Sequence, residues 1–171
     1  MELFIIMTLR KFIKESLFQY LKEQELFNNI WYHGGEKKIT KFASTPSVNR
    51  RGNVEGFYFT SNIDIAKNYG DEITSVKLKV KKPFFLGKTD VSETMVKTYA
   101  QKLREDNDHL PIDSPWIKDK CQNFKERSYM PYTGLDGLSQ QIVFKSGGFD
   151  CVVDGHEICV FDNDDIIILQ N

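Results

Sequence analysis

Apolar residues recur at spacings of three and four along residues 8–24, and lysine, glutamate and glutamine occupy positions between them. The apolar stripe consists of Leu9, Phe12, Ile13, Leu17, Tyr20 and Leu21. This spacing predicts an amphipathic helix, which Thr8 can cap, within an N-terminal helical extension over residues 1–28. We expect its apolar face to pack on the body of the protein, with docking to a partner as the alternative.

The pattern then changes to that of short strands. Strands are predicted over residues 30–33, 56–60, 76–80 and 83–86, with a polar loop over residues 44–56 and a helix over residues 62–69. The first strand ends at Gly34-Gly35 and the helix stops at Gly70. In the third strand, apolar residues alternate with lysines, which predicts one solvated face.

The middle of the chain is helical and the last part returns to strands. Helices are predicted over residues 92–105, from Ser114-Pro115 onward and over residues 135–146, and strands over residues 149–153, 157–161 and 166–169. Because strands precede and follow the helices rather than alternate with them, this order predicts an α+β fold with antiparallel hairpins. We expect one domain over residues 1–171, with residues 87–145 as a helical insertion.

Composition and charge narrow the class of protein. The chain has 171 residues, of which 40 % are hydrophobic, which suits one domain with a sizeable core. Lys and Arg number 23 and Asp and Glu number 24, so the net charge of −1 argues against binding of nucleic acid by bulk charge. The three cysteines form no CxxC pair, so we expect a reducing, cytoplasmic location and no zinc site. The N-terminal apolar run over residues 3–7 is too short for a membrane span or a signal peptide.

Four short features contain residues suited to chemistry. They are the run Trp31-Tyr32-His33-Gly34, the block over residues 56–69 with Tyr58 and Tyr69, the strand that begins at Glu157, and the pair Arg50-Arg51 in the polar loop. Each feature alone is more typical of a structural role, such as a core tyrosine or a solvated glutamate. Their combination and their order along the chain favour a functional role.

Together these segments resemble the motifs of the ADP-ribosyltransferases of the diphtheria-toxin and poly-ADP-ribose-polymerase type. Residues 31–34 resemble the aromatic-His-Gly signature of that family. Residues 56–69 resemble its Gly-x-Tyr-Phe motif, which has a second tyrosine eleven residues after the first. Residues 157–162 resemble its third motif, a glutamate that leads an apolar strand. The preceding segment, residues 147–155, is similar to that of small bacterial and bacteriophage members.

The resemblance implies a fold of two small antiparallel sheets packed around a cleft for NAD, which is cleaved between nicotinamide and ribose. The transition state resembles an oxocarbenium ion, as in glycoside hydrolysis. Two aromatic rings can sandwich the nicotinamide, a glycine lets the backbone approach it, a histidine can bind a ribose hydroxyl, and a glutamate stabilises the developing cation. We therefore predict as catalytic residues Glu157, His33 and Tyr58, and as NAD-binding residues His33, Gly34, Tyr58, Tyr69 and Arg51. NAD is the expected co-substrate, and no metal is expected.

Two positions depart from the family pattern. Ala66 replaces a serine that holds the nicotinamide amide in the polymerases, which removes a hydrogen bond worth about 1 kcal/mol. Gly35 stands where serine or threonine often follows the His-Gly pair. The other large branch of the family, which uses an arginine on the first strand and a Glu-x-Glu motif, is disfavoured, because His33 replaces the arginine and Gly155 precedes Glu157 by two residues.

The expected function is that of a mono-ADP-ribosyltransferase acting on a macromolecule, with protein favoured over nucleic acid by the balanced charge. We expect a bacterial toxin or bacteriophage effector, in which residues 87–145 and the turn over residues 154–156 select the acceptor. Three alternatives stay open: an NAD glycohydrolase, a catalytically silent NAD- or ADP-ribose-binding module, and a relative that modifies a small drug. A nucleic acid acceptor would be favoured by a basic patch formed by Lys77, Lys79 and Lys81 together with the Arg50-Arg51 pair.

Overall fold

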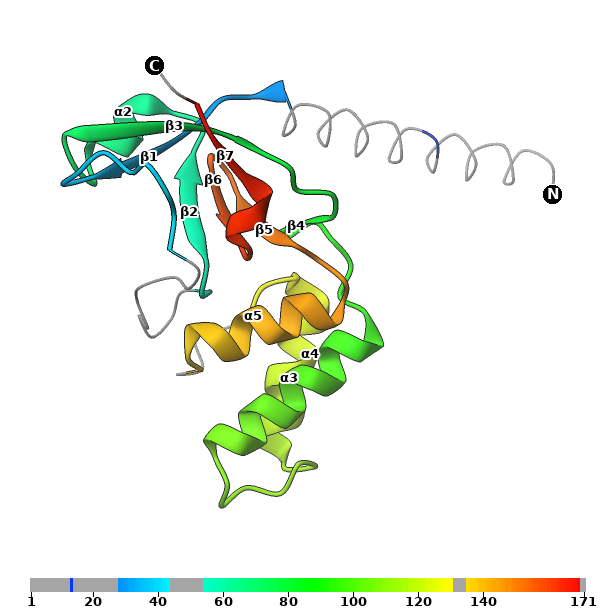
Figure 1. The fold of residues 1–171 in the computed structure, drawn as a ribbon. Coiled ribbons are helices and arrows are strands. Elements are labelled where there is room, and N and C mark those ends of the chain that lie inside the picture. The colour runs from blue at the N-terminus through cyan, green and yellow to red at the C-terminus, as the bar shows by residue number, and fades with distance from the viewer. Residues whose placement is uncertain (1–12, 14–27, 44–53, 131–134, 170–171) are drawn as a thin grey trace.

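The computed structural model describes Ile13 and residues 28–43, 54–130 and 135–169 of the chain. Apart from Ile13, the helix predicted over residues 8–24 lies outside the described residues. Arg51 and most of the predicted polar loop lie outside them as well. Within the described ranges, seven strands, four α-helices and one short 3₁₀ helix form an α+β fold (Figure 1).

The strands form one sheet. They are β1 (Trp31–Gly35), β2 (Phe57–Thr60), β3 (Glu72–Leu78), β4 (Pro83–Phe85), β5 (Cys151–Asp154), β6 (Glu157–Val160) and β7 (Ile166–Ile168). Their order in the sheet is β4-β5-β6-β2-β1-β3-β7, and all neighbours are antiparallel except β4 and β5, which are parallel. The three predicted motifs therefore begin on three neighbouring strands, β1, β2 and β6, near the middle of the sheet.

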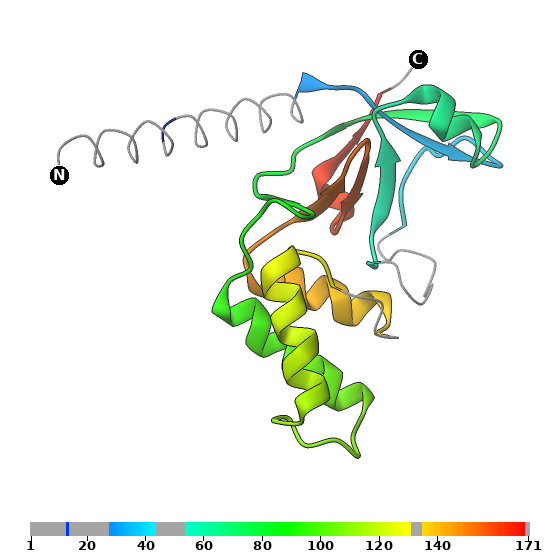
Figure 2. The same ribbon diagram turned by 180° about the vertical axis from the view of Figure 1, so that it is seen from behind.

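The expectation of two separate antiparallel sheets is not confirmed, because hydrogen bonds join all seven strands into one mixed sheet. The connection between its two parts is narrow. β1 and β2 share a single register pair, Tyr32 with Thr60, whereas five pairs join β1 to β3. Figure 1 and Figure 2 both show β3 running crosswise to β2. The sheet therefore bends between β1 and β2.

The bend lets the sheet enclose a hydrophobic core of its own. The buried members of this cluster are Trp31, Phe42, Phe57, Phe59, Val76, Leu78, Val80, Phe85, Cys151, Val153, Ile158 and Val160. None of these residues belongs to a described helix, so strands on the two sides of the bend cover one another's apolar faces. A core between two parts of the sheet is thus present, although the parts are joined.

The helices begin where the sequence supplies a capping side chain. They are α2 (Ile63–Lys67), α3 (Glu93–Asp106), α4 (Pro115–Arg127) and α5 (Gly137–Ser146), and the 3₁₀ helix is Asn163–Asp165. At the starts of the four α-helices, side-chain oxygens of Asn62, Ser92, Ser114 and Asp136 accept hydrogen bonds from backbone amides of the first turn. No described helix is long and apolar enough to cross a membrane.

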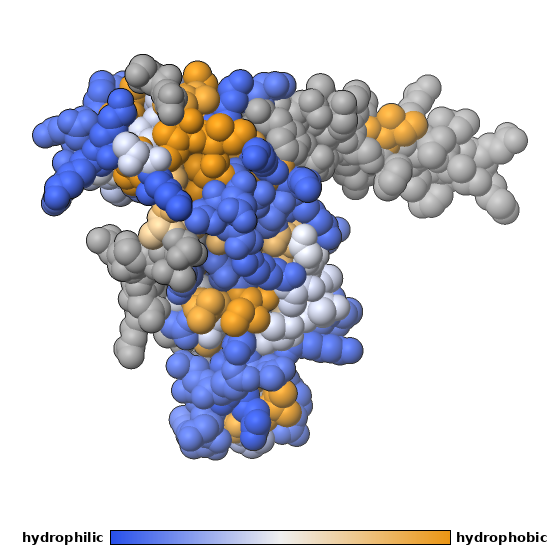
Figure 3. All heavy atoms as spheres, in the orientation of Figure 1, coloured by the Kyte–Doolittle hydropathy of each residue, from blue (hydrophilic) through white to orange (hydrophobic). Residues whose placement is uncertain are grey.

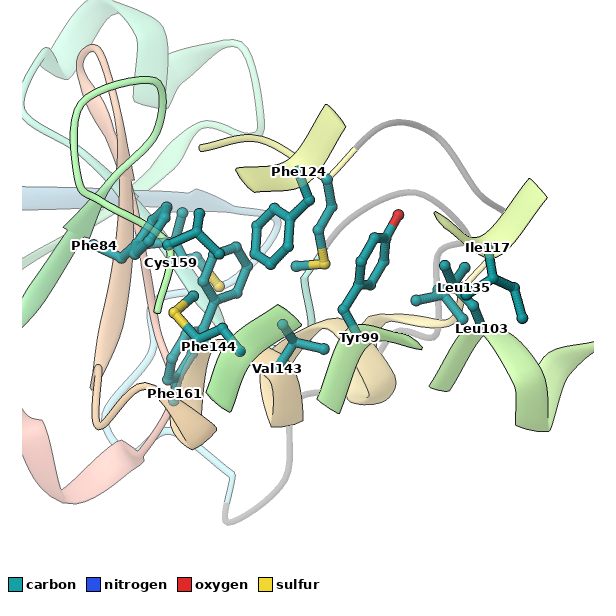
Figure 4. Packing of buried hydrophobic residues seen from close by; sticks show 14 residues of the cluster. Phe84, Tyr99, Leu103, Ile117, Phe124, Leu135, Val143, Phe144, Cys159 and Phe161 are labelled. Carbon is teal, nitrogen blue, oxygen red and sulfur yellow. The ribbon is translucent and has the colours of Figure 1, made fainter. Parts of the chain in front are cut away.

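The three longer helices form a unit on one side of the sheet (Figure 1, Figure 2). In Figure 4, Phe144 of α5 lies close to Phe84, Cys159 and Phe161, whereas Tyr99, Leu103, Ile117 and Leu135 pack farther from the sheet. The ring centroids of Phe84 and Phe144 are 4.9 Å apart. Cys159 of β6 is paired with Tyr58 of β2, and paired residues share one face of a sheet. The helical unit therefore packs on the face of the sheet to which the Tyr58 side chain belongs.

Two elements differ from the sequence prediction. β3 begins at Glu72, earlier than predicted, because it pairs with the whole of β1, as far as Gly35 opposite Glu72. The parallel pairing of β4 with β5 replaces a predicted antiparallel arrangement. The segment with α3, α4 and α5 between β4 and β5 is the long crossover that a parallel pair requires, and such distant pairing leaves no local pattern in the sequence.

Candidate active site

His33 joins β1 to β2 through its ring. Its Nδ1 lies 2.9 Å from the main-chain oxygen of Tyr58. A carbonyl oxygen only accepts, so Nδ1 is the donor in this contact, and Nε2 is the ring nitrogen that this bond does not use. The ring also makes edge contacts with Phe42 and Phe59, at centroid distances of 5.6 and 5.9 Å. These contacts fix the ring and leave Nε2 as the nitrogen that can meet a ligand.

Gly34 is the point of closest approach between β1 and α2. A Cβ at this position would lie 1.8 Å from the main-chain oxygen of Ala66 and 3.3 Å from the Cβ of Tyr69. Ala66 itself is 1 % exposed. The neighbouring Gly35 is different, since a Cβ there would meet no atom closer than 3.7 Å. Glycine at position 34 is therefore required by packing, and this packing sets α2 and the following Tyr69 against β1.

Tyr58 is a partly exposed residue whose hydroxyl is held by a hydrogen bond. The hydroxyl donates a hydrogen bond of 2.5 Å to the main-chain oxygen of Val54. Burial of the hydroxyl end, followed by the nearby Cys159 and Glu157, raises the pKa of Tyr58 well above the usual range of tyrosine. The residue as a whole is nevertheless 39 % exposed. Tyr58 is therefore a neutral phenol at physiological pH, with part of its ring surface accessible.

Tyr69 and Glu157 connect the second motif to the third. The Tyr69 hydroxyl donates a hydrogen bond of 3.1 Å to Oε1 of Glu157. The negative charge of Glu157, and then this hydrogen bond and slight burial, raise the pKa of Tyr69. Tyr69 is 64 % exposed and Glu157 is half-buried. The carboxylate has a second oxygen and further lone pairs, so it can accept a hydrogen bond from a ligand beside that from Tyr69.

The start of β6 holds Glu157 in place. Glu157 pairs with Thr60 of β2 on one side and with Asp154 of β5 on the other. Gly155 has a φ of +57°, which suits the tight turn between β5 and β6. The amide of Ser61 donates a 2.9 Å hydrogen bond to the main-chain oxygen of His156 in that turn. The backbone around Glu157 is thus fixed by both neighbouring strands.

The structure brings the three motifs together through two hydrogen bonds, His33 to Tyr58 and Tyr69 to Glu157. The side chains do not all converge. The His33 ring lies against Phe59, which belongs to the hydrophobic core that the strands enclose. Among the described contacts, none joins the His33 ring to Tyr69 or Glu157. Arg51 lies outside the described residues.

A hollow in the described surface is lined by none of the predicted site residues. Its lining consists of Thr40, Lys41, Phe42, Asn163, Asp164, Ile166, Ile167 and Ile168. Figure 3 shows hydrophobic side chains gathered where β7 runs in Figure 1, and Ile167 is 40 % exposed. Phe42 connects the hollow to the His33 ring. Across the described ranges, no group of three or more His, Cys, Asp or Glu side chains is placed to hold a metal ion.

The motifs did not reveal what holds Tyr58. The main-chain oxygen of Val54 is its hydrogen-bond partner, and the neighbouring Glu55 is bonded to α5 through Gly137 and Gln141. Backbone partners leave no mark in a sequence. The buried Gln141 does leave one, because it interrupts the apolar residues of a helix that packs on the core.

Comparison with known proteins gives a family match and a distant structural likeness. A family model described as "ADP-Ribosyltransferase in polyvalent proteins" matches residues 28–167. No curated protein matches the chain. Among solved structures, the crystal structure of an anti-CRISPR protein is similar over 82 % of this chain and 94 % of that chain, with 12 % identity and a TM-score of 0.47. A likeness this distant carries no argument about function.

Proposed function

Since the chain belongs to the family of ADP-ribosyltransferases in polyvalent proteins, we propose that it is a mono-ADP-ribosyltransferase of the His-Tyr-Glu type with NAD as co-substrate. One observation supports this type above others. The hydrogen bonds from His33 to Tyr58 and from Tyr69 to Glu157 join the three motifs that such a site requires, although 88 residues separate Tyr69 from Glu157.

The proposed reaction breaks the bond between C1′ of the ribose and the nicotinamide nitrogen. The bonding electron pair leaves with nicotinamide, which becomes neutral, and positive charge develops on the ribose. A nucleophilic atom of the acceptor then forms a bond to C1′ and loses its proton. Glu157 is proposed to accept a hydrogen bond from the 2′-hydroxyl and to stabilise the developing cation by its charge.

The two tyrosines are proposed to hold the nicotinamide ring. Both residues are partly exposed, and each hydroxyl is already bonded, to Val54 or to Glu157. A ring fixed in this way loses little freedom when it stacks on a ligand. The raised pKa of Tyr58 argues for stacking rather than proton transfer as its role. The backbone at Gly34, which has no side chain of its own, is proposed to meet the carboxamide.

His33 is proposed to bind the adenosine ribose. Its Nδ1 proton is engaged by Tyr58, so Nε2 can accept a hydrogen bond from a ribose hydroxyl. Its position toward Phe59, away from Glu157, suits a ligand that extends across the bend of the sheet. Arg51 stays a predicted NAD-binding residue from the sequence.

The acceptor is proposed to be a macromolecule, and a protein rather than a nucleic acid. The net charge of −1 supports this choice, because a nucleic-acid-binding surface usually needs an excess of positive charge. We further propose that the protein works in a cytoplasm as a bacterial toxin or bacteriophage effector, on its resemblance to small members of those groups.

The test uses NAD labelled in its adenylate part, a cell lysate, and the wild-type protein beside Glu157→Gln. After incubation, the lysate is separated into protein and nucleic acid. We expect label in the protein fraction with the wild type and none there with Glu157→Gln. Label in nucleic acid would correct the acceptor, and free ADP-ribose without any labelled macromolecule would show a glycohydrolase. No consumption of NAD by the wild type would overturn the proposal.

A further inference from the structure

The main chain before β2 is bound to α5 at two points on one residue. The amide of Glu55 donates a 2.9 Å hydrogen bond to the main-chain oxygen of Gly137. The main-chain oxygen of Glu55 accepts a 2.9 Å hydrogen bond from Nε2 of Gln141. Gly137 and Gln141 are four residues apart on α5 and so lie on the same face of the helix. Both polar groups of the Glu55 backbone are therefore satisfied by one turn of α5.

The buried position of Gln141 indicates that its amide is needed for this contact. The residue is 7 % exposed on a helix whose buried neighbours include Val143 and Phe144. A buried amide is costly unless it is hydrogen-bonded. A leucine at this position would add apolar packing without the donor, so the amide must contribute something other than core volume. What it contributes is the position of Glu55.

The residues on either side of Glu55 lead directly to Tyr58. Val54 supplies the oxygen that holds the Tyr58 hydroxyl. Gly56 packs closely on β6, because a Cβ there would lie 2.4 Å from Sγ of Cys159 and 2.7 Å from the main-chain oxygen of Val160. The segment of residues 54–56 is thus fixed between α5 and β6. Movement of Glu55 would carry the Val54 oxygen away from the Tyr58 hydroxyl.

We propose that Gln141 is a positioning residue for the nicotinamide site, and that the helical insertion orients Tyr58 through Glu55 and Val54. This inference rests on the proposed function, because it concerns the ring proposed to stack on nicotinamide. The insertion then has a role within the NAD site, separate from any selection of the acceptor. Gln141 itself touches neither NAD nor the reacting atoms.

The test compares Gln141→Met with Gln140→Met. Gln140 is a matched control: it is buried, adjacent, and donates through Nε2 to a backbone oxygen, but that oxygen belongs to Leu135 rather than Glu55. Gln141→Met is expected to raise the KM for NAD about fivefold, the effect of one hydrogen bond, with kcat within about twofold. Gln140→Met is expected to leave KM unchanged while lowering the melting temperature comparably. An equal rise in KM for both variants would overturn the proposal.

A double-mutant cycle adds a readout that a merely structural residue would not move. Tyr58→Phe removes the hydroxyl that Val54 holds. If Gln141 acts through that hydroxyl, then Gln141→Met should change KM by less than about twofold in the Tyr58→Phe background. Fully additive effects on KM would contradict the route through Val54.

A measurement without NAD separates failure of this inference from failure of the proposed function. Amide hydrogen exchange follows the Glu55 N–H, which is bonded to Gly137. Faster exchange at Glu55 in Gln141→Met than in Gln140→Met is expected whether or not NAD is bound. If that difference is seen but the wild type does not bind NAD, the proposed function fails, whereas the role of Gln141 in holding the Glu55 backbone is supported. If the wild type cleaves NAD and no difference is seen, the inference fails alone.

Discussion

The Tyr69 hydroxyl donates a hydrogen bond to Oε1 of Glu157, which links a residue just after α2 to the first residue of β6. The two belong to different motifs and lie on different sides of the central strand β2. The contact orients the carboxylate while leaving its other oxygen for a ligand. Tyr69 also lies beside Gly34, whose close packing on Ala66 sets the position of α2.

The role of Tyr69 can be divided between its ring and its hydroxyl. Tyr69→Phe keeps the ring and is expected to lower the affinity for NAD less than about threefold. Tyr69→Ala removes the stacking surface and is expected to lower it about tenfold, the upper range for an aromatic pair. Because Tyr69 is 64 % exposed, neither change should alter the melting temperature much. Isothermal titration with NAD measures the affinity. Equal losses in the two variants would contradict stacking.

Gly34 should not tolerate a methyl group. In Gly34→Ala the new Cβ would lie 1.8 Å from a main-chain oxygen, so α2 must move. We expect a loss of about 1–3 kcal/mol in the free energy of unfolding, as for an overpacked core, together with loss of NAD binding. Gly35→Ala is the control, because its Cβ has room. Urea denaturation of both variants measures the difference. Similar stabilities for the two would show that the close approach at Gly34 has no consequence.

The raised pKa of Tyr58 predicts how stability changes at alkaline pH. A tyrosine with a higher pKa in the folded state ionises more readily when unfolded. Its contribution to stability is therefore complete below the unfolded pKa of about 10 and is lost as the pH rises above it. Tyr69, whose pKa is also raised, acts in the same direction.

Tyr58→Phe tests this effect. It should cost about 1 kcal/mol at neutral pH, for the lost bond to Val54, and should make the decline in the free energy of unfolding above pH ~10 less steep. Urea denaturation between neutral and alkaline pH gives the slope, with the exposed Tyr129→Phe as a control for loss of a tyrosine. An unchanged alkaline slope in Tyr58→Phe would show that this residue does not set it.

Asp136 caps α5 and should stabilise the protein through ionisation. Hydrogen bonds from Ser139 lower the pKa of Asp136, so its contribution is present above the unfolded pKa of about 4 and is lost as the pH falls through the lower folded value. Asp136→Ala is expected to cost about 1 kcal/mol at neutral pH. Asp136→Asn should keep much of the cap but remove its acid dependence. Melting temperatures from pH 7 downward check both expectations, and a full neutral cost in the asparagine variant would contradict capping.

Local patterns in the sequence predicted most elements of the fold, because signals such as the Ser114-Pro115 start and the glycine after residue 146 mark helix ends directly. The pairing of strands that are far apart in the sequence was not predictable in this way. The parallel contact of β4 with β5 spans the helical insertion, and the single pair of Tyr32 with Thr60 that joins the sheet depends on the bend. Neither has a local signal.

The same division holds at the site. Residue types and spacing led to the prediction of His33, Tyr69 and Glu157, because the family resemblance rests on side chains. The partners that hold them were not predictable where they are backbone atoms. The oxygen of Val54 is one example, and the Glu55 backbone that Gln141 binds is another.

Glu157 is the residue proposed to stabilise the transition state when NAD is cleaved. The most direct test is release of nicotinamide by the purified protein with its acceptor-containing lysate, comparing the wild type with Glu157→Gln. Glu126→Gln, an exposed glutamate on α4, controls for loss of a carboxylate. We expect the rate of release to fall about a hundredfold or more in Glu157→Gln, as when a preorganised charge at a reacting centre is removed, and to stay at the wild-type value in Glu126→Gln. Release of nicotinamide at the wild-type rate by Glu157→Gln would show that this carboxylate does not contribute to cleavage.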